Sequence, residues 1–231
     1  MPNSTRPHHQ RVLRLLNSMS AELLETTACY FGGGTRIVLE LGEYRESLDV
    51  DFLCANQDGY RELRNQVSSQ SLGGIFAHQP TLLREVRADM YGIRTFVEID
   101  SQPVKFEIIR EARIPLAGTY IPNLPVPCLD HSSSVAEKFL ANTDRGLDKS
   151  TRSRDLIDLA FMVGSWADDE VSQGLELAEA AYGPSVLNLL KSTVETFGND
   201  DYQKQCLTEL EVRNKRTLEA GLRRLAGLLK S

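Results

Sequence analysis

The sequence predicts an α/β (α+β) fold, in which a sheet flanked by helices is followed by a helical C-terminal region. Residues 48–54 alternate apolar and acidic side chains, as a strand with one buried face does. Residues 84–110 alternate in three stretches separated by turns, and the chain beyond residue 132 is rich in helical patterns. We therefore expect two domains, a core over residues 1–127 and a helical region over residues 128–231.

The core is expected to open with an amphipathic helix over residues 10–28, where apolar residues recur at helical spacing. Residues 35–41 and 48–54 are predicted as the first two strands, joined by the polar turn GEYRES. Residues 59–69 are predicted to be helical. These elements would surround the first part of the sheet.

The stretch from 84 to 110 is predicted to form an antiparallel meander, with turns at Tyr91-Gly92 and at residues 101–103. Four prolines between residues 115 and 127 favour an extended linker. The sheet is thus expected to be complete before the helical region begins.

The composition is that of an ordinary globular protein, with 41% hydrophobic and 25% charged residues. No apolar run is long enough to span a bilayer, and the N-terminus lacks the apolar core of a signal peptide. The four cysteines are scattered without zinc-type spacing, so we expect reduced thiols in a cytoplasmic protein.

A glycine-rich turn precedes the predicted strands, in the sequence Gly32-Gly33-Gly34-Thr35. Backbone without a Cβ atom can approach a ligand closely, and successive free N–H groups form a cradle for phosphate. The pattern differs from both the P-loop and the dinucleotide fingerprint. Gly33, Gly34 and Thr35 are therefore candidate nucleotide-binding residues.

Two acids follow within the segment LDVDFL. Because side chains alternate along a strand, Asp49 and Asp51 are expected on one face, while Leu48, Val50 and Phe52 point into the core. Neighbouring carboxylates repel each other unless a cation lies between them, and Mg²⁺ binds one or two carboxylates together with substrate phosphates. The pattern predicts a magnesium site that handles a polyphosphate.

The combined pattern GG-T-x9-R-x-S-x-D-x-D resembles the first motif of minimal nucleotidyltransferases of the polymerase-beta-like superfamily. Arg45 and Ser47 ahead of the acids are similar to the AbiE-type (AbiEii/AbiGii) nucleotidyltransferase toxins of type IV toxin–antitoxin systems. Three later segments also resemble that family, namely VKFEIIREARI at 104–114, AEKFLANTDR at 136–145 and SRDLIDLAFM at 153–162.

The resemblance implies a nucleotidyltransferase-like mixed sheet flanked by helices, with a C-terminal helical bundle that completes the nucleotide pocket. It implies a nucleoside triphosphate substrate such as ATP, GTP or CTP, with Mg²⁺ as cofactor and two ions possible. It also implies a tRNA or other RNA acceptor and a separately encoded antitoxin. Arg45 and Ser47 would contact the nucleotide.

A third carboxylate is expected from the segment VKFEII, where Glu107 points away from the apolar side of the strand. The resemblance implies that such a residue completes the metal site with Asp49 and Asp51. Asp100 is the alternative, but it borders a turn and is also explained as a solvated residue. If Glu107 is the third ligand, two metal ions could bracket the reacting phosphorus.

A helix is predicted over residues 134–144, with Ser134 and Glu137 as a capping box. Lys138 would then lie in the opening turns, near the positive end of the helix dipole, where a cation gains nothing from the dipole. An anion outside the helix, such as the β- and γ-phosphates, explains this lysine better. The family also implies a lysine here.

Asp155 and Asp158 lie three residues apart and are therefore neighbours on one helix face. The resemblance implies that this helix closes the nucleotide pocket. Arg154 would contact phosphate or pair with an acid, and Asp155 would orient Lys138 or an attacking group. Acids in a first helical turn are also favourable for structural reasons alone.

The net charge of −6 is unusual for a protein that binds RNA. Basic residues gather locally around residues 145–154, and a local patch can attract RNA even on an acidic protein. Two alternatives therefore stay open: a small-molecule nucleotidyltransferase of the aminoglycoside-modifying type, and a non-catalytic protein that binds nucleotide or docks a partner.

Overall fold

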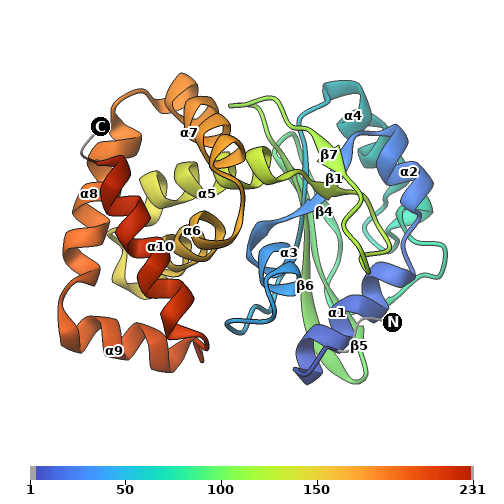
Figure 1. The fold of residues 1–231 in the computed structure, drawn as a ribbon. Coiled ribbons are helices and arrows are strands. Elements are labelled where there is room, and N and C mark those ends of the chain that lie inside the picture. Colours follow the sequence, from blue (N-terminus) through green and yellow to red (C-terminus); the bar gives the residue numbers. More distant parts are fainter. Residues whose placement is uncertain (1–3, 230–231) are drawn as a thin grey trace. The chain divides into compact units, whose positions relative to one another are not determined.

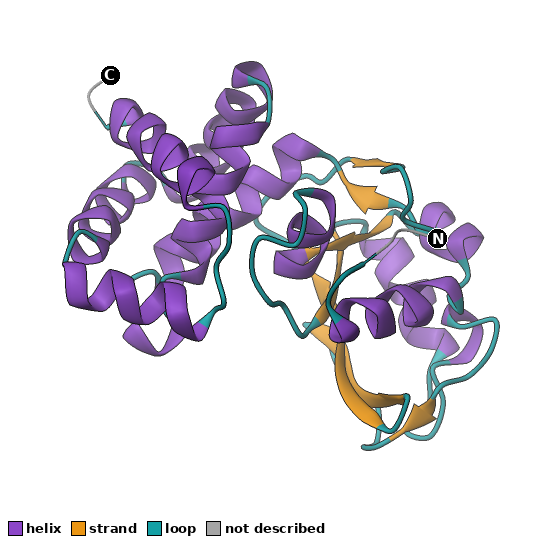
Figure 2. Ribbon diagram, turned by 60° about the horizontal axis from the view of Figure 1, so that its bottom comes forward, coloured by secondary structure: helices purple, strands orange, loops and turns teal. Residues whose placement is uncertain are grey.

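The computed structural model describes residues 4–229, and the chain divides into two compact units. Unit 1 comprises residues up to Leu39 together with Ser47–Asp130, and unit 2 comprises Glu40–Glu46 together with the chain from His131 onward. Figure 2 shows the strands in unit 1 and the helices that build unit 2. The division into domains at residue 127 stays a prediction.

Unit 1 is built on a mixed sheet with the strand order β3-β5-β6-β2-β1-β8-β7, and β4 pairs with β5 at one side. The pairs β1–β8 and β2–β6 are parallel and the other pairs are antiparallel. The strands are β1 (Cys29–Gly32), β2 (Val50–Cys54), β3 (Thr81–Leu82), β4 (Arg87–Ala88), β5 (Gly92–Ile99), β6 (Gln102–Arg110), β7 (Gly118–Thr119) and β8 (Cys128–Leu129).

Helices cover both faces of this sheet (Figure 1). The helices α1, α2 and α4 lie on one face and α3 on the other. Their bounds are α1 (Pro7–Asn17), α2 (Ala21–Thr26), α3 (Gly33–Glu40) and α4 (Gln57–Gln66), with a short 3₁₀ turn at Gly73–Ile75.

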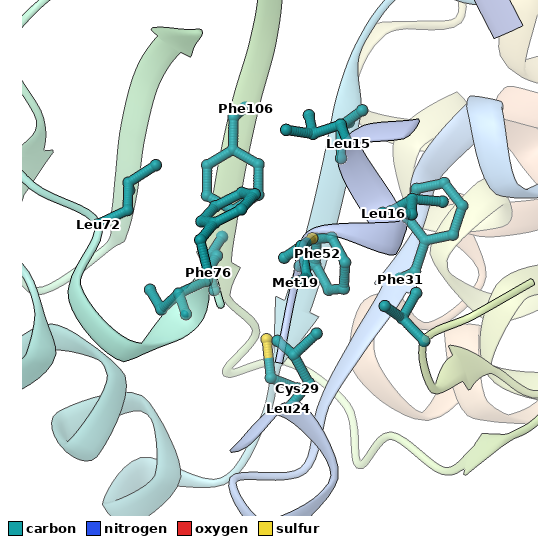
Figure 3. Packing of buried hydrophobic residues seen from close by; sticks show 14 of the residues in the cluster. Leu15, Leu16, Met19, Leu24, Cys29, Phe31, Phe52, Leu72, Phe76 and Phe106 are labelled. Atoms are coloured by element: carbon teal, nitrogen blue, oxygen red, sulfur yellow. The ribbon is translucent and has the colours of Figure 1, made fainter. Parts of the chain in front are cut away.

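The core of unit 1 lies between the sheet and the helices α1, α2 and α4. Phe31, Phe52 and Phe106 project from three neighbouring strands and are fully buried against Leu15 and Leu16 of α1 (Figure 3). Burial of one such side chain stabilises a fold by about 1.5–3 kcal/mol. Since side chains alternate along each strand, the intervening residues of β2 and β6 face away from this core.

Unit 2 is helical apart from its loops, as predicted for the chain beyond residue 132. Its helices are α5 (His131–Arg145), α6 (Arg154–Ser165), α7 (Asp168–Tyr182), α8 (Ser185–Phe197), α9 (Asp200–Glu209) and α10 (Lys215–Leu228), with a 3₁₀ turn at Lys149–Thr151. Within residues 4–229, no helix combines the length and the apolar character that crossing a membrane requires.

The antiparallel meander is confirmed, since β4 pairs with β5 and β5 with β6. The predicted strand over residues 35–41 is wrong, because Gly33–Glu40 forms the helix α3 and the first strand is Cys29–Gly32. A short apolar run such as RIVLE suits either element, and here four consecutive residues, from Thr35 to Val38, are buried. Burial without alternation fits a helix packed against the sheet.

The predicted opening helix over residues 10–28 is divided into α1 and α2. Ser20 begins α2 by accepting a hydrogen bond from the backbone N–H of Leu23, and Met19 forms a β-bridge with Phe76. The expectation that Leu48 points into the core is also wrong, because β2 begins only at Val50 and the Leu48 side chain is exposed.

Candidate active site

The glycine turn joins β1 directly to α3. Gly32 ends the strand and Gly33 begins the helix with φ +66°, a left-handed conformation that side chains with a Cβ rarely adopt. A Cβ atom on Gly33 would lie 2.5 Å from Oδ2 of Asp51. Glycine at this position therefore lets the Asp51 carboxylate pack against the backbone at the start of α3.

Hydrogen bonds tie the first turn of α3 to the segment that precedes β2. The Thr35 hydroxyl donates to the carbonyl oxygen of Asp49 at 2.5 Å and lies 2.8 Å from the Ser47 hydroxyl. The Ser47 backbone N–H donates to Nε2 of the buried His9 at 3.3 Å. Thr35 and Ser47 thus fix the backbone from which Asp49 projects, and His9 is a contributor that sequence analysis missed.

The candidate acids on β2 and β6 are direct neighbours in the sheet. Asp51 lies opposite Gly32 on one side and opposite Glu107 on the other. Residues directly opposite each other across a strand pair place their side chains on the same face. Asp51 and Glu107 therefore share the sheet face away from the aromatic core.

Lys105 lies among the three predicted carboxylates, although sequence analysis gave it no role. Its ammonium group pairs with Oε2 of Glu107 at 2.5 Å, and Nε of Arg94 lies 3.4 Å from the other oxygen. Burial lowers the pKa of Lys105, but Glu107, followed by Asp49 and Asp51, raises it above its ordinary value. The lysine supplies the positive charge that such a group of acids requires.

The alternative third acid, Asp100, lies elsewhere. It occupies the turn between β5 and β6 with φ +50° and pairs with Arg14. Glu107 is five residues beyond the start of β6, which at about 3.3 Å per residue places the turn roughly 16 Å along the strand. The structure thus brings Glu107, and not Asp100, beside Asp51.

The acids fit a magnesium ion held partly by substrate, but they do not form a closed metal cage. Within residues 4–229, no group of three or more His, Cys, Asp or Glu side chains is arranged to hold a metal ion. Mg²⁺ is usually bound by one or two carboxylates, with water and substrate phosphates completing its shell. Asp51 and Glu107, with Asp49 close to the same lysine, match that open type of site.

Unit 2 contains a second group of predicted residues, in a buried charge network. The Lys138 ammonium contacts Asp155 at 2.9 Å and Asp158 at 2.7 Å, and all three side chains are almost fully buried. Arg45 forms a two-pronged ion pair with Asp158, at 2.7 Å from Nε and 2.8 Å from Nη2. The Tyr44 hydroxyl also donates to Asp158 at 2.6 Å.

These contacts keep both aspartates ionised despite their burial. Burial raises the pKa of Asp155 and of Asp158, but the opposing charges outweigh it and hold both values below the ordinary range. For Asp155 the charges are those of Lys138 and Arg145, and for Asp158 those of Arg45 and Lys138. Burial and the neighbouring Asp158 raise the pKa of Tyr44, which is therefore a neutral donor.

The predicted capping box at Ser134 is wrong, because α5 begins at His131 and Ser134 lies inside the helix. Lys138 is thus mid-helix, and the dipole argument for a nearby phosphate no longer applies. The ion pairs with Asp155 and Asp158 account for a buried lysine at this position of the helix.

Arg154 has no ion pair or side-chain hydrogen bond with any residue in the described part of the chain. Arg145 pairs with Asp155 instead, at 2.7 Å. The sequence signal for Arg145 was its place at the end of the segment AEKFLANTDR, seven residues after Lys138 and therefore on the same face of α5.

The fold and the first group of residues define the class of protein. A mixed sheet with a glycine turn at the end of β1 and carboxylates on β2 and β6, the next two strands on one side, is the arrangement expected of a nucleotidyltransferase. Two solved structures from Helicobacter pylori share this fold. The protein JHP933 matches with a TM-score of 0.54 and 16% identity over 98% of this chain and 93% of its own. A second protein, described as a candidate nucleotidyltransferase, matches with a TM-score of 0.54 and 18% identity over 96% of this chain and 92% of its own.

The sequence profile of the AbiEii nucleotidyl transferase toxin of type IV toxin–antitoxin systems matches residues 14–213. The chain belongs to this family and is a nucleotidyltransferase. A comparison with curated proteins gives no match. The sequence-based resemblance to AbiE-type toxins is thereby confirmed.

Proposed function

We propose that this nucleotidyltransferase uses Mg²⁺ to transfer a nucleoside monophosphate from a nucleoside triphosphate to RNA, with transfer RNA as the first acceptor to test. In this proposal it acts as the toxin of a toxin–antitoxin pair, and a separately encoded antitoxin relieves its effect. The observation that carries the proposal is the register of Gly32, Asp51 and Glu107 on three adjacent strands.

The binding step follows from the N-terminal end of α3. Its first backbone N–H groups are not used within the helix, and helix N-termini favour anions. The triphosphate would lie against Gly33, Gly34 and Thr35. Asp49 and Asp51, with Glu107 beside them, would hold Mg²⁺, which when bound neutralises phosphate charge and polarises the reacting phosphoryl group.

The chemical step forms one bond and breaks another at the α-phosphorus. The acceptor hydroxyl oxygen forms a new P–O bond, the bond to the pyrophosphate leaving group breaks, and the hydroxyl proton passes to a base. Glu107 would either accept that proton or hold a second Mg²⁺. The contribution of the protein is alignment and charge stabilisation, as in phosphoryl transfer generally.

The buried network of unit 2 has a positioning role in this proposal. Arg45 anchors the segment Glu40–Glu46 to Asp158, and that segment runs directly into Ser47 and Asp49. A fixed Arg45 would therefore restrain the stretch of chain that leads into Asp49 and β2. Binding of nucleotide phosphate by Lys138, Arg45 or Arg154 stays a prediction. A lysine has three N–H donors and Lys138 uses two on the aspartates.

The test is transfer of label from each of the four α-phosphate-labelled triphosphates to total transfer RNA. We expect transfer by the wild type with Mg²⁺, none after chelation, and at least a hundredfold loss in Asp51→Asn. The matched control is Asp58→Asn, an exposed acid on α4 of the same unit, which should keep full activity. Transfer by Asp51→Asn at the wild-type rate would overturn the assignment.

The same variants separate the alternative functions. Label that moves only to an aminoglycoside-type hydroxyl would replace the RNA proposal with the small-molecule enzyme. Mg²⁺-dependent triphosphate binding without transfer to any acceptor would favour the non-catalytic protein. Growth arrest on expression that disappears in Asp51→Asn would support the toxin.

A further inference from the structure

Beyond the acids, the strands β5 and β4 carry further residues that pair directly across the sheet toward its edge. Glu107 lies opposite Arg94 on β5, and Arg94 lies opposite Arg87 on β4. Directly opposed residues share a face. The face that carries Asp51 and Glu107 therefore changes from acidic to basic over the next two strands.

These strands form a pocket of about 480 Å³. The pocket is lined by four cationic side chains and two acidic ones, namely Arg84, Arg87, Arg94 and Lys105, and Glu85 and Glu107. The pocket thus carries a positive excess on a chain whose net charge is −6. A local basic cavity of this kind attracts an anionic ligand.

The cations of the pocket divide into two kinds. Lys105 and Arg94 pair with Glu107, and Arg94 also contacts Asp89. Arg84 and Arg87 are exposed and form no ion pair with any residue between 4 and 229. These two guanidinium groups are available for a ligand.

An aromatic platform lies beside them. The Arg84 guanidinium lies over the Phe96 ring, with Cζ 4.6 Å from the ring centre. Single-stranded nucleic acids are bound by cations that contact phosphates together with planar groups, including arginine guanidinium planes, on which bases stack. The pocket offers both kinds of contact.

We propose that this pocket binds the phosphate backbone of the RNA acceptor, within a few nucleotides of the reacting hydroxyl. The inference rests on the proposed function, because it takes Asp51 and Glu107 as the reacting centre. Adjacent strands lie about 4.8 Å apart, so Arg94 and Arg87 are roughly 5 and 10 Å from the strand of Glu107. A row of cationic side chains over this span suits the repeated negative charges of a phosphate backbone.

The test measures RNA binding separately from catalysis. The probe is a fluorescein-labelled single-stranded RNA, and the readout is fluorescence anisotropy without triphosphate over a range of salt concentrations. The double variant Arg84→Gln/Arg87→Gln is compared with Arg61→Gln/Arg64→Gln. The control pair has the same spacing and charge and lies exposed on α4 of the same unit.

We expect the Arg84/Arg87 variant to bind RNA at least tenfold more weakly, with a salt dependence reduced by about one to two phosphate contacts. The control pair should change the dissociation constant less than twofold. Equal RNA binding by the two double variants, or no RNA binding by the wild type, would overturn the pocket assignment.

The outcome also separates this inference from the proposed function. RNA binding that depends on Arg84 and Arg87, in a protein that transfers no label, would keep the pocket and overturn the reaction. Label transfer that depends on Asp51 but not on these arginines would keep the reaction and overturn the pocket.

Discussion

Replacing Gly33 by alanine tests whether the close approach of α3 to Asp51 matters for activity. The added Cβ atom has two separate effects. It forces a side chain into a backbone with φ +66°, and it would lie 2.5 Å from Oδ2 of Asp51. The first effect concerns stability, and the second concerns the position of the carboxylate.

The magnitudes follow from this geometry. A non-glycine residue in the left-handed region costs about 1–2 kcal/mol, which lowers the melting temperature of a chain this long by about 2–8 °C. Ordinary contact with a Cβ begins at 3.4 Å, so the carboxylate must move by about 1 Å. A displacement of that size in an active site can reduce the rate about a hundredfold.

Gly42 supplies the matched control. It also has a positive φ, of +79°, but a Cβ atom there would meet nothing within 4 Å. Gly42→Ala should therefore carry the backbone cost without displacing a carboxylate. Both variants are assayed for melting temperature by circular dichroism and for nucleotide transfer under saturating substrate.

We expect a similar small loss of stability in both variants and a large loss of transfer only in Gly33→Ala. Activity of Gly33→Ala within threefold of the wild type would refute the reasoning. Equal loss of activity in both variants would show that backbone strain, and not displacement of Asp51, is responsible.

Two further predictions concern the buried network of unit 2. Asp158→Asn removes the carboxylate partner of Arg45 and one of the two carboxylate partners of Lys138. Breaking a buried pair costs about 3–5 kcal/mol, whereas Asp168→Asn, on an exposed acid, should cost under about 1 kcal/mol in chemical denaturation. Stability should also fall in acid. Because the folded-state pKa of Asp155 is depressed, its contribution is present above its ordinary value of 3.8 and is lost as the pH falls below it. The stability difference between wild type and Asp155→Asn should therefore shrink from pH 7 to pH 3. A constant difference would contradict this origin.

The local sequence was enough to predict which way several residues of the candidate site face. Alternation in LDVDFL and VKFEII placed Asp51 and Glu107 on the face of their strands away from the aromatic core, because side-chain direction along a strand follows from the backbone itself. The meander was predictable for the same reason. Counting back from the turn at Ser101 would also have placed Arg94 opposite Glu107.

Other features depended on contacts between distant segments. The run RIVLE is compatible with a helix or a strand, and it forms a helix because it packs against the sheet. The sequence did not show that Lys138 pairs with two aspartates 17 and 20 residues away, and its role as a phosphate ligand stays a prediction. Sequence determined which residues are polar and which way they face within one element. Only the tertiary structure decided which charges meet, because pairing across strands and helices is set by register and burial of the whole fold.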